Sequence, residues 1–203
     1  SACLVGLGDV YKRQNHLFNL FLISSFLVNA LVFAHEKRPN IILIMADDMG
    51  YEALSSNGSE SCKSPHLDKL AAKGVRFTNC FSNPICTPSR VKIMTGQYNV
   101  RNYVKFGWLD REQTTFAHQL KKAGYATAIA GKWQLGQDKK LPKYFGFDEH
   151  ILWQLNTRGR DSTGLDKRYS NPRLVKNGIT YEENEGRFST EMIVDYILSL
   201  IHI

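Results

Sequence analysis

The sequence predicts an α/β protein with a largely parallel central sheet and helices on both of its faces. Residues 41–46 form a short run that is apolar on both faces, which is typical of a buried and most often parallel strand. Apolar side chains at helical spacing follow at 64–74, and residues 75–81 then alternate as a strand does. Because strand, helix and strand succeed one another, we expect helices to cover the sheet.

The first helix is predicted over 64–74. Leu67 and Leu70 lie at helical spacing, Ser64 is a residue type that caps helix starts, and Gly74 is a typical stop. This segment therefore has a start, an apolar face and an end of its own.

The later elements are predicted with unequal strength. Residues 114–124 form a helix pattern that ends in glycine, and 125–132 resemble a strand of small residues. Residues 137–187 are polar and rich in turn residues, so they give only weak signals. A last helix is expected over 188–198, where apolar residues return at helical spacing.

The two ends of the chain differ in character from the rest. Residues 1–14 contain no Met and join no periodic pattern. Both they and 198–203 resemble translated sequencing-adapter read-through, with a genuine N-terminal tail as the alternative for 1–14. On the first interpretation the chain is a piece of a longer protein, truncated on the C-terminal side, and residues 1–14 take no part in the fold.

A signal peptide is predicted over 15–34. Residues 17–34 carry no charge, end in a small-x-small-like site at Ala34 and give way at once to polar residues. That order is typical of a secretory signal cleaved after Ala34, and an uncleaved anchor is the alternative, because the run is barely long enough to span a bilayer. We expect a periplasmic or secreted protein with no stable membrane span after cleavage.

The composition excludes several classes of protein. The chain has 203 residues, of which 43% are hydrophobic and 22% charged, and this balance excludes a disordered or fibrous protein. Lys and Arg number 26 against 19 Asp and Glu, but the basic residues are scattered, so nucleic acid is not an expected partner. The four cysteines have no zinc-like spacing with the histidines.

Ligands of such sheets bind at the carboxyl ends of the strands, which directs attention to 47–48, 82–90 and 131–132. Asp47 and Asp48 directly follow the predicted buried strand, where two neighbouring carboxylates repel each other and lose hydration. A divalent cation relieves both costs, and oxygen ligands favour calcium or magnesium over zinc. A solvated turn that closes the strand is the alternative.

The segment Pro-Ile-Cys-Thr-Pro-Ser-Arg around Cys86 is a candidate anion site. Thr87 is an N-cap residue type, Pro88 suits the first helical position, and the pattern continues to Gly96. Cys86 would then precede a helix amino end that favours an anion, with Arg90 one turn further on. A buried structural cysteine with a surface arginine is the alternative.

These motifs together resemble the type I sulfatases of the alkaline phosphatase superfamily. Residues 86–96, Cys-x-Pro-Ser-Arg followed by x-x-Ile-Met-Thr-Gly, are similar to the family signature. Residues 38–51 resemble the family's opening strand with its metal aspartates, 64–81 its first helix–strand unit, and 124–136 its second signature. The resemblance implies an alkaline-phosphatase-like fold, with 38–203 as an incomplete N-terminal catalytic domain.

The resemblance also implies a role for each site residue. A formylglycine-generating enzyme would convert Cys86 to Cα-formylglycine, whose hydrated gem-diol is the nucleophile and also touches the metal. Asp47 and Asp48 would bind Ca²⁺, or Mg²⁺, which also holds the sulfate. Arg90 would stabilise the formylglycine hydrate, and Lys132 would contact the sulfate ester. The implied activity is hydrolysis of sulfate esters of a small molecule or glycan.

Two departures from the family stand out. Gln134 occupies a position where the family usually has His, which contacts the gem-diol and assists its breakdown. The family's remaining metal ligands, and another His and Lys at the sulfate, are not identifiable, so we expect the 203-residue chain alone to be inactive. With Cys86 modified, Cys62 and Cys80 are either two buried thiols or a disulfide.

Two other functions stay open at this point. One is a phosphonate or phosphodiester hydrolase of the same superfamily, which activity ratios on aryl sulfates and aryl phosphodiesters would separate from a sulfatase. The other is a non-catalytic relative that binds sulfated ligands, against which the presence of Cys86 and Lys132 argues.

Overall fold

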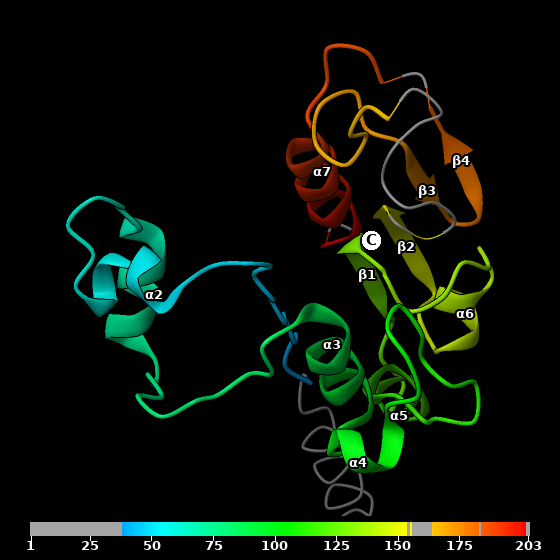
Figure 1. The fold of residues 1–203 in the computed structure, drawn as a ribbon, viewed down its shortest axis with the longest axis horizontal. Coiled ribbons are helices and arrows are strands. Elements are labelled where there is room, and N and C mark those ends of the chain that lie inside the picture. The colour runs from blue at the N-terminus through cyan, green and yellow to red at the C-terminus, as the bar shows by residue number, and fades with distance from the viewer. Residues whose placement is uncertain (1–37, 154, 156–163, 183, 202–203) are drawn as a thin grey trace, which may run out of the picture. The chain divides into compact units, whose positions relative to one another are not determined.

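The computed structural model describes residues 38–153, 155, 164–182 and 184–201 (Figure 1). The predicted signal peptide at 15–34 and residues 1–14 lie outside these ranges. The chain divides into two compact units, Ser1–Ala46 and Asp47–Ile203, and only 38–46 of the first unit are described. Within the described ranges, no helix is both long and apolar enough to cross a membrane.

The second unit contains a four-stranded sheet in the order β1-β2-β3-β4 (Figure 1). β1 (Ala128–Lys132) pairs in parallel with β2 (Glu149–Trp153), and β2 pairs antiparallel with β3 (Leu174–Lys176). β3 and β4 (Ile179–Tyr181) form an antiparallel hairpin. The α/β class is confirmed, and the described sheet is mixed: β1 and β2 pair in parallel as predicted, whereas its other two pairings are antiparallel.

Two apolar clusters cover the two faces of the sheet. The larger one includes Trp133, Phe145 and Leu152, together with residues of the helices α3 (Cys86–Thr95), α5 (Phe116–Lys122) and α6 (Leu141–Tyr144). The smaller one joins Ile151 to Tyr196 of α7 (Ser189–Ile201). Ile151 and Leu152 are neighbours on β2 and therefore point to opposite faces. Helices thus lie against both faces, as the sequence predicts.

The predicted helices are found, and the shorter ones were missed. The structure has η1 (Tyr51–Ala53), η2 (Ser55–Asn57), α2 (Pro65–Lys73), α3 (Cys86–Thr95), α4 (Asn99–Asn102), α5 (Phe116–Lys122), α6 (Leu141–Tyr144) and α7 (Ser189–Ile201). α5 begins after Thr115, whose hydroxyl accepts a hydrogen bond from the His118 backbone N–H. α3 ends at Gly96 in the left-handed conformation (φ 66°), which glycine adopts without a Cβ penalty.

Two predicted strands are wrong. Neither 41–46 nor 75–81 forms a strand, and the side chains of Ile42 and Ile44 are 72% and 79% exposed. Phe77 is similarly open, at 76%. A strand is held by hydrogen bonds to a neighbour and by burial against another layer, and the four strands of the described sheet pair with one another instead. Apolar runs and alternation alone therefore do not create these strands.

Candidate active site

Cys86 is the first residue of α3, and Arg90 lies about one turn further along the helix. The helix begins slightly earlier than predicted, because its N-cap is Ile85 and not Thr87. The Thr87 hydroxyl accepts a hydrogen bond from the Gly107 N–H at 3.1 Å, so it serves another segment. The partly exposed Cys86 side chain therefore sits in the first turn, where the free N–H groups of the helix lie.

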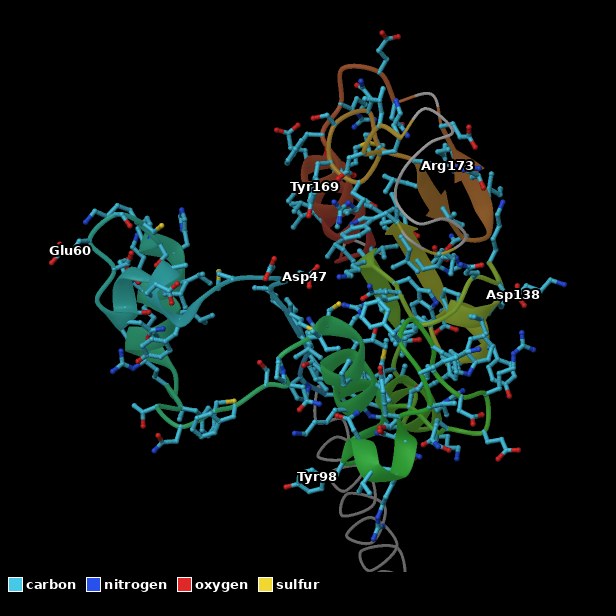
Figure 2. All side chains as sticks on the ribbon, in the orientation of Figure 1. Asp47, Glu60, Tyr98, Asp138, Tyr169 and Arg173 are labelled. Atoms are coloured by element: carbon cyan, nitrogen blue, oxygen red, sulfur yellow. The ribbon has the colours of Figure 1, made fainter. Side chains whose placement is uncertain are left out.

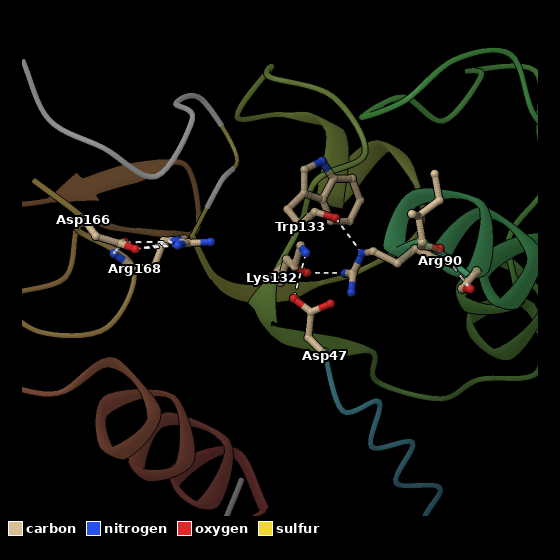
Figure 3. Close-up of polar contacts among 8 residues, drawn as sticks. Asp47, Arg90, Lys132, Trp133, Asp166 and Arg168 are labelled. Carbon is tan, nitrogen blue, oxygen red and sulfur yellow. Dashed lines mark hydrogen bonds and ion pairs between the residues drawn. The ribbon is translucent and has the colours of Figure 1, made fainter. Parts of the chain in front are cut away.

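Arg90 connects α3 to the end of β1 (Figure 3). Its Nε donates to the Trp133 carbonyl at 2.9 Å, and its Nη2 donates to the Lys132 carbonyl. Burial lowers the pKa of Arg90, and the negative charges of Asp47 and of an ionised Cys86 oppose that effect. Arg90 is thus a half-buried cation that interacts electrostatically with both the carboxylate and the cysteine of the predicted site.

Lys132, the last residue of β1, makes an ion pair with Asp47 (Figure 3). Its Nζ lies 2.7 Å from Asp47 Oδ2, and its side chain is only 11% exposed, against 37% for Asp47. The ammonium also lies 5.8 Å from the centroid of the Trp153 ring, on the neighbouring strand. The carboxylate and the aromatic ring together fix this ammonium at the carboxyl end of a parallel strand.

The other two predicted site residues, Asp48 and Gln134, make no comparable contacts with the residues that the structure describes. Both have a left-handed backbone, with φ 58° at Asp48 and 51° at Gln134. The extended conformation therefore ends at Lys132, and strand alternation does not extend to Gln134. Gln134 Oε1 is buried and has no hydrogen-bond partner within the part of the chain that the structure describes.

The three cysteines that the structure describes form no disulfide. Cys62, Cys80 and Cys86 are all free, so the disulfide alternative is wrong, and Cys62 and Cys80 are exposed thiols and not buried ones.

Over the described ranges, no three His, Cys, Asp or Glu side chains gather to hold a metal ion. Asp47 and Asp48 supply carboxylate oxygens of the kind that calcium and magnesium prefer, but they make only part of a coordination shell.

Sequence reasoning missed a second charged group near Lys132. Arg168 Nε donates to both carboxylate oxygens of Asp166 at 2.9 Å, and the Arg168 Cζ lies 5.4 Å from the Tyr169 ring centroid. The hydrogen bond to Asp166, and then more weakly the charge of Asp47, raise the pKa of Arg168. This group lies in the polar stretch 137–187, where no periodic pattern or motif could have pointed to it.

The charged groups at the end of β1 and the cysteine of α3 together define a class of protein. A parallel strand that ends in a lysine–carboxylate pair, beside a half-buried arginine and a cysteine at a helix start, is suited to binding an oxyanion. The family model described as Sulfatase matches residues 39–201. The chain belongs to the sulfatase family.

Curated relatives agree with this assignment. An arylsulfatase from Hemicentrotus pulcherrimus is 36% identical over 191 residues, which cover 82% of this chain and 35% of the relative. The steryl-sulfatase of Homo sapiens is 41% identical over 130 residues, which cover 57% of this chain and 22% of the relative. The chain therefore spans about a third of the first relative's length.

Solved structures agree with the fold. The crystal structure of Ps i-CgsB matches with a TM-score of 0.69 and 26% identity, over 82% of this chain and 42% of the other. The PsFucS1 sulfatase from Pseudoalteromonas sp. matches with a TM-score of 0.52 and 30% identity, over 62% of this chain and 28% of the other. The alkaline-phosphatase-like fold expected from the sequence is confirmed by these structural neighbours.

Proposed function

We propose that this protein is a sulfuric ester hydrolase acting on sulfate esters of carbohydrates. The observation that carries the proposal is the Asp47–Lys132 ion pair beside Arg90, all within motifs that match the sulfatase family. Support for a sugar substrate comes from an N-acetylgalactosamine-6-sulfatase of Mus musculus, which is 38% identical over 128 residues. Ps i-CgsB, solved in complex with k-i-k-neocarrahexaose, matches with a TM-score of 0.70.

Cys86 is the nucleophile's precursor in this proposal. A formylglycine-generating enzyme would convert it to Cα-formylglycine, and the hydrated aldehyde would supply the attacking oxygen. The first-turn N–H groups of α3 and the positive end of its dipole favour negative charge at this position. Arg90, one turn along, adds a positive charge whose attraction for an anion is stronger in these partly buried surroundings than it would be in water. Helix and arginine thus orient position 86 and favour its reactive, partly anionic form.

Asp47 and Asp48 are the residues that would hold a divalent cation. The chemistry of the donors fits calcium or magnesium, because both residues are carboxylates and both are exposed. A cation there would polarise the sulfate oxygens and balance the charge that develops on them. Lys132 already compensates one oxygen of Asp47, so the second oxygen is the one that can turn toward a cation.

Lys132 and Arg90 divide the remaining work. Sulfate transfer moves negative charge onto oxygen, and cations already fixed in place stabilise that charge without reorganising. Lys132 is the group that would contact the sulfate, since its nearly buried ammonium is held by Asp47 and Trp153. Arg90 keeps the backbone of Lys132 in place through its hydrogen bond to the Lys132 carbonyl, so it also acts as a positioning residue.

The proposal includes export and a maturation partner. The apolar, uncharged stretch 17–34 with its small-residue end at Ala34 supports a secretory signal. Oxidation of Cys86 requires a formylglycine-generating enzyme in the producing cell. We therefore place the protein outside the cytoplasm, where sulfated glycans are accessible.

Mass spectrometry of Cys86 tests the proposed nucleophile. The full-length protein is produced together with a formylglycine-generating enzyme and digested with trypsin, which releases the peptide from Phe77 to Arg90. Cys86 should be found as an aldehyde, while Cys80 in the same peptide should remain a thiol and serves as an internal control. An active preparation in which Cys86 is only a thiol contradicts the proposal.

Activity measurements complete the test. Cys86→Ala should abolish hydrolysis of an aryl sulfate, whereas Cys62→Ser, at an exposed thiol, should leave the rate unchanged. An aryl phosphodiester measured alongside should be cleaved more slowly than the aryl sulfate. The reverse order of rates would favour the phosphodiesterase alternative.

A further inference from the structure

We propose that Arg168 forms a second anion subsite, which selects sulfate esters whose alcohol part carries another anionic group, such as a carboxylate or a second sulfate. The inference rests on the proposed function, because it assumes that the first sulfate binds at Lys132. It names the substrate class more narrowly: acidic or multiply sulfated glycans. Arg168 would be a specificity-determining residue, since it would bind a part of the substrate that does not react.

Arg168 is held rigidly. Its guanidinium is fixed along one edge by two hydrogen bonds of 2.9 Å from Nε to Asp166, and Nη2 donates to the same carboxylate. Tyr169 lies under the guanidinium plane, 5.4 Å from Cζ. Tyr169 is fixed in turn, because its carbonyl accepts from the Ser189 N–H at 2.8 Å at the start of α7 (Figure 2). A fixed arginine loses little side-chain entropy when it binds a ligand.

A chain of contacts leads from Arg168 to the catalytic strand. The Tyr169 ring lies 6.1 Å from the Trp153 ring, and Trp153 lies 5.8 Å from Lys132 Nζ. The Asp47 carboxylate, which pairs with Lys132, also acts on Arg168 electrostatically. In the view of Figure 3, Lys132 and Asp47 are drawn between Arg90 and Arg168. Arg168 is therefore near enough to meet the alcohol part of an ester bound at Lys132.

The chemistry of the guanidinium favours an anion. Asp166 takes hydrogen bonds from Nε and Nη2, and no described residue accepts one from Nη1, whose donors point away from Asp166. The Nη1 edge of the guanidinium offers only donors. Two carboxylate or sulfate oxygens match these donors better than a hydroxyl, which must also donate. The side chain is about one-third exposed, so a ligand can reach it. The nearby cations Lys132 and Arg90 and the nearby carboxylates leave no strong excess of either charge. A second anion would therefore bind beside a site that already accommodates one.

The test compares two substrates in the full-length wild-type protein and in three variants of it. The substrates are 4-sulfooxybenzoate and its methyl ester, of which only the first carries a second negative charge, and each substrate is compared with itself between the wild type and a variant. Arg168→Gln should lower kcat/KM for the carboxylate about tenfold or more, and change that for the methyl ester little. Arg168→Lys keeps the charge but loses the fork, so it should fall between. Arg111→Gln is the matched control, since Arg111 also pairs with an aspartate (Asp138, 2.9 Å) and stacks on a tyrosine.

Binding of unreactive ligands separates this proposal from the proposed function. Calorimetry measures 4-sulfobenzoate and benzenesulfonate with the wild-type protein and with Arg168→Gln. The subsite is supported if the extra carboxylate tightens binding about tenfold and Arg168→Gln abolishes that gain, even where neither ester is hydrolysed and only the proposed function fails. If both esters are hydrolysed and Arg168→Gln lowers them equally, the proposed function stands and the subsite is wrong. If neither hydrolysis nor Arg168-dependent binding is found, both fail.

Discussion

Gln134 combines three properties that make it the most unusual residue of the site. It stands where the sulfatase family usually has histidine. Its backbone is left-handed (φ 51°), and its Oε1 is buried without a hydrogen-bond partner among the described residues. A left-handed glutamine costs of the order of 1 kcal/mol, so the fold maintains this conformation against a local preference. The amide can accept or donate a hydrogen bond, but it cannot take up a proton near neutral pH.

Gln134→His therefore should change the slow part of the reaction. Help from a general base is worth about a hundredfold to ten-thousandfold, and glutamine cannot give it. In the full-length enzyme we expect a burst of released alcohol followed by slower steady turnover, as sulfate release limits the rate. Gln134→His should raise the steady rate more than the burst in stopped-flow measurements, while Gln137→His, at an exposed position, should change neither. Absence of a burst, with a slower histidine variant, would show that Gln134 is an adapted binding residue.

At the scale of elements, His150 ties β2 to the β3–β4 hairpin. Its Nε2 accepts a hydrogen bond from the Gly178 N–H at 3.1 Å, and its backbone N–H donates to Asn177 Oδ1 at 2.8 Å. Nε2 can accept only when the ring is neutral, so a proton there would break the bond. Burial lowers the pKa of His150, and the neighbouring Glu149 charge opposes this more weakly.

The hairpin should therefore lose stability in mild acid. The pKa of His150 is lower in the folded state than its ordinary value of 6.5, so the unfolded chain binds a proton first as the pH falls. The contribution of His150 to the free energy of unfolding is fully present above pH 6.5 and declines as the pH falls below that value. His150→Gln keeps an acceptor for Gly178 and should remove this decline between about pH 8 and pH 5, measured by urea unfolding. His66→Gln, at an exposed residue of α2, is the control. Parallel pH profiles for wild type and His150→Gln would contradict the assignment.

How far the sequence predicts the elements depends on how local their signals are. α2 and α5 have their own helical patterns and end signals and α7 has apolar spacing of its own, so all three were predicted. The β3–β4 hairpin was missed, although Asn177-Gly178 is a strong hairpin signal whose two positive φ values (50° and 87°) permit the turn. Its strands are only three residues long, too short for a clear alternation.

The residues of the candidate site also divide into those that local sequence signals predict and one that they do not. Cys86 and Arg90 belong to one local motif, and strand-end reasoning identified Lys132 and Asp47, whose pairing spans 85 residues. Arg168 could not be predicted, because only tertiary packing brings it to this edge of the sheet.

At the scale of the whole molecule, the charged site contrasts with several exposed apolar segments. Ile41, Ile42, Leu43 and Ile44 are 57% to 79% exposed, and Val75 and Phe77 are 80% and 76% exposed. Soluble proteins seldom leave contiguous apolar runs open, and an exposed apolar segment rich in β-branched residues is a template for pairing with another chain. We expect the 203-residue chain in isolation to associate with itself through 41–44.

Ile42→Lys tests this expectation. A charge in the middle of the run should reduce self-association, which sedimentation velocity would detect as a shift from oligomer to monomer. Because Ile42 is 72% exposed, the free energy of unfolding should change by no more than about 0.5 kcal/mol. Val100→Lys is the matched control, since Val100 is 93% exposed but stands outside any apolar run, and it should leave association unchanged. A loss of several kcal/mol in Ile42→Lys would contradict the exposed conformation, because burying an unpaired lysine is that costly, and it would restore the buried strand that the sequence predicts.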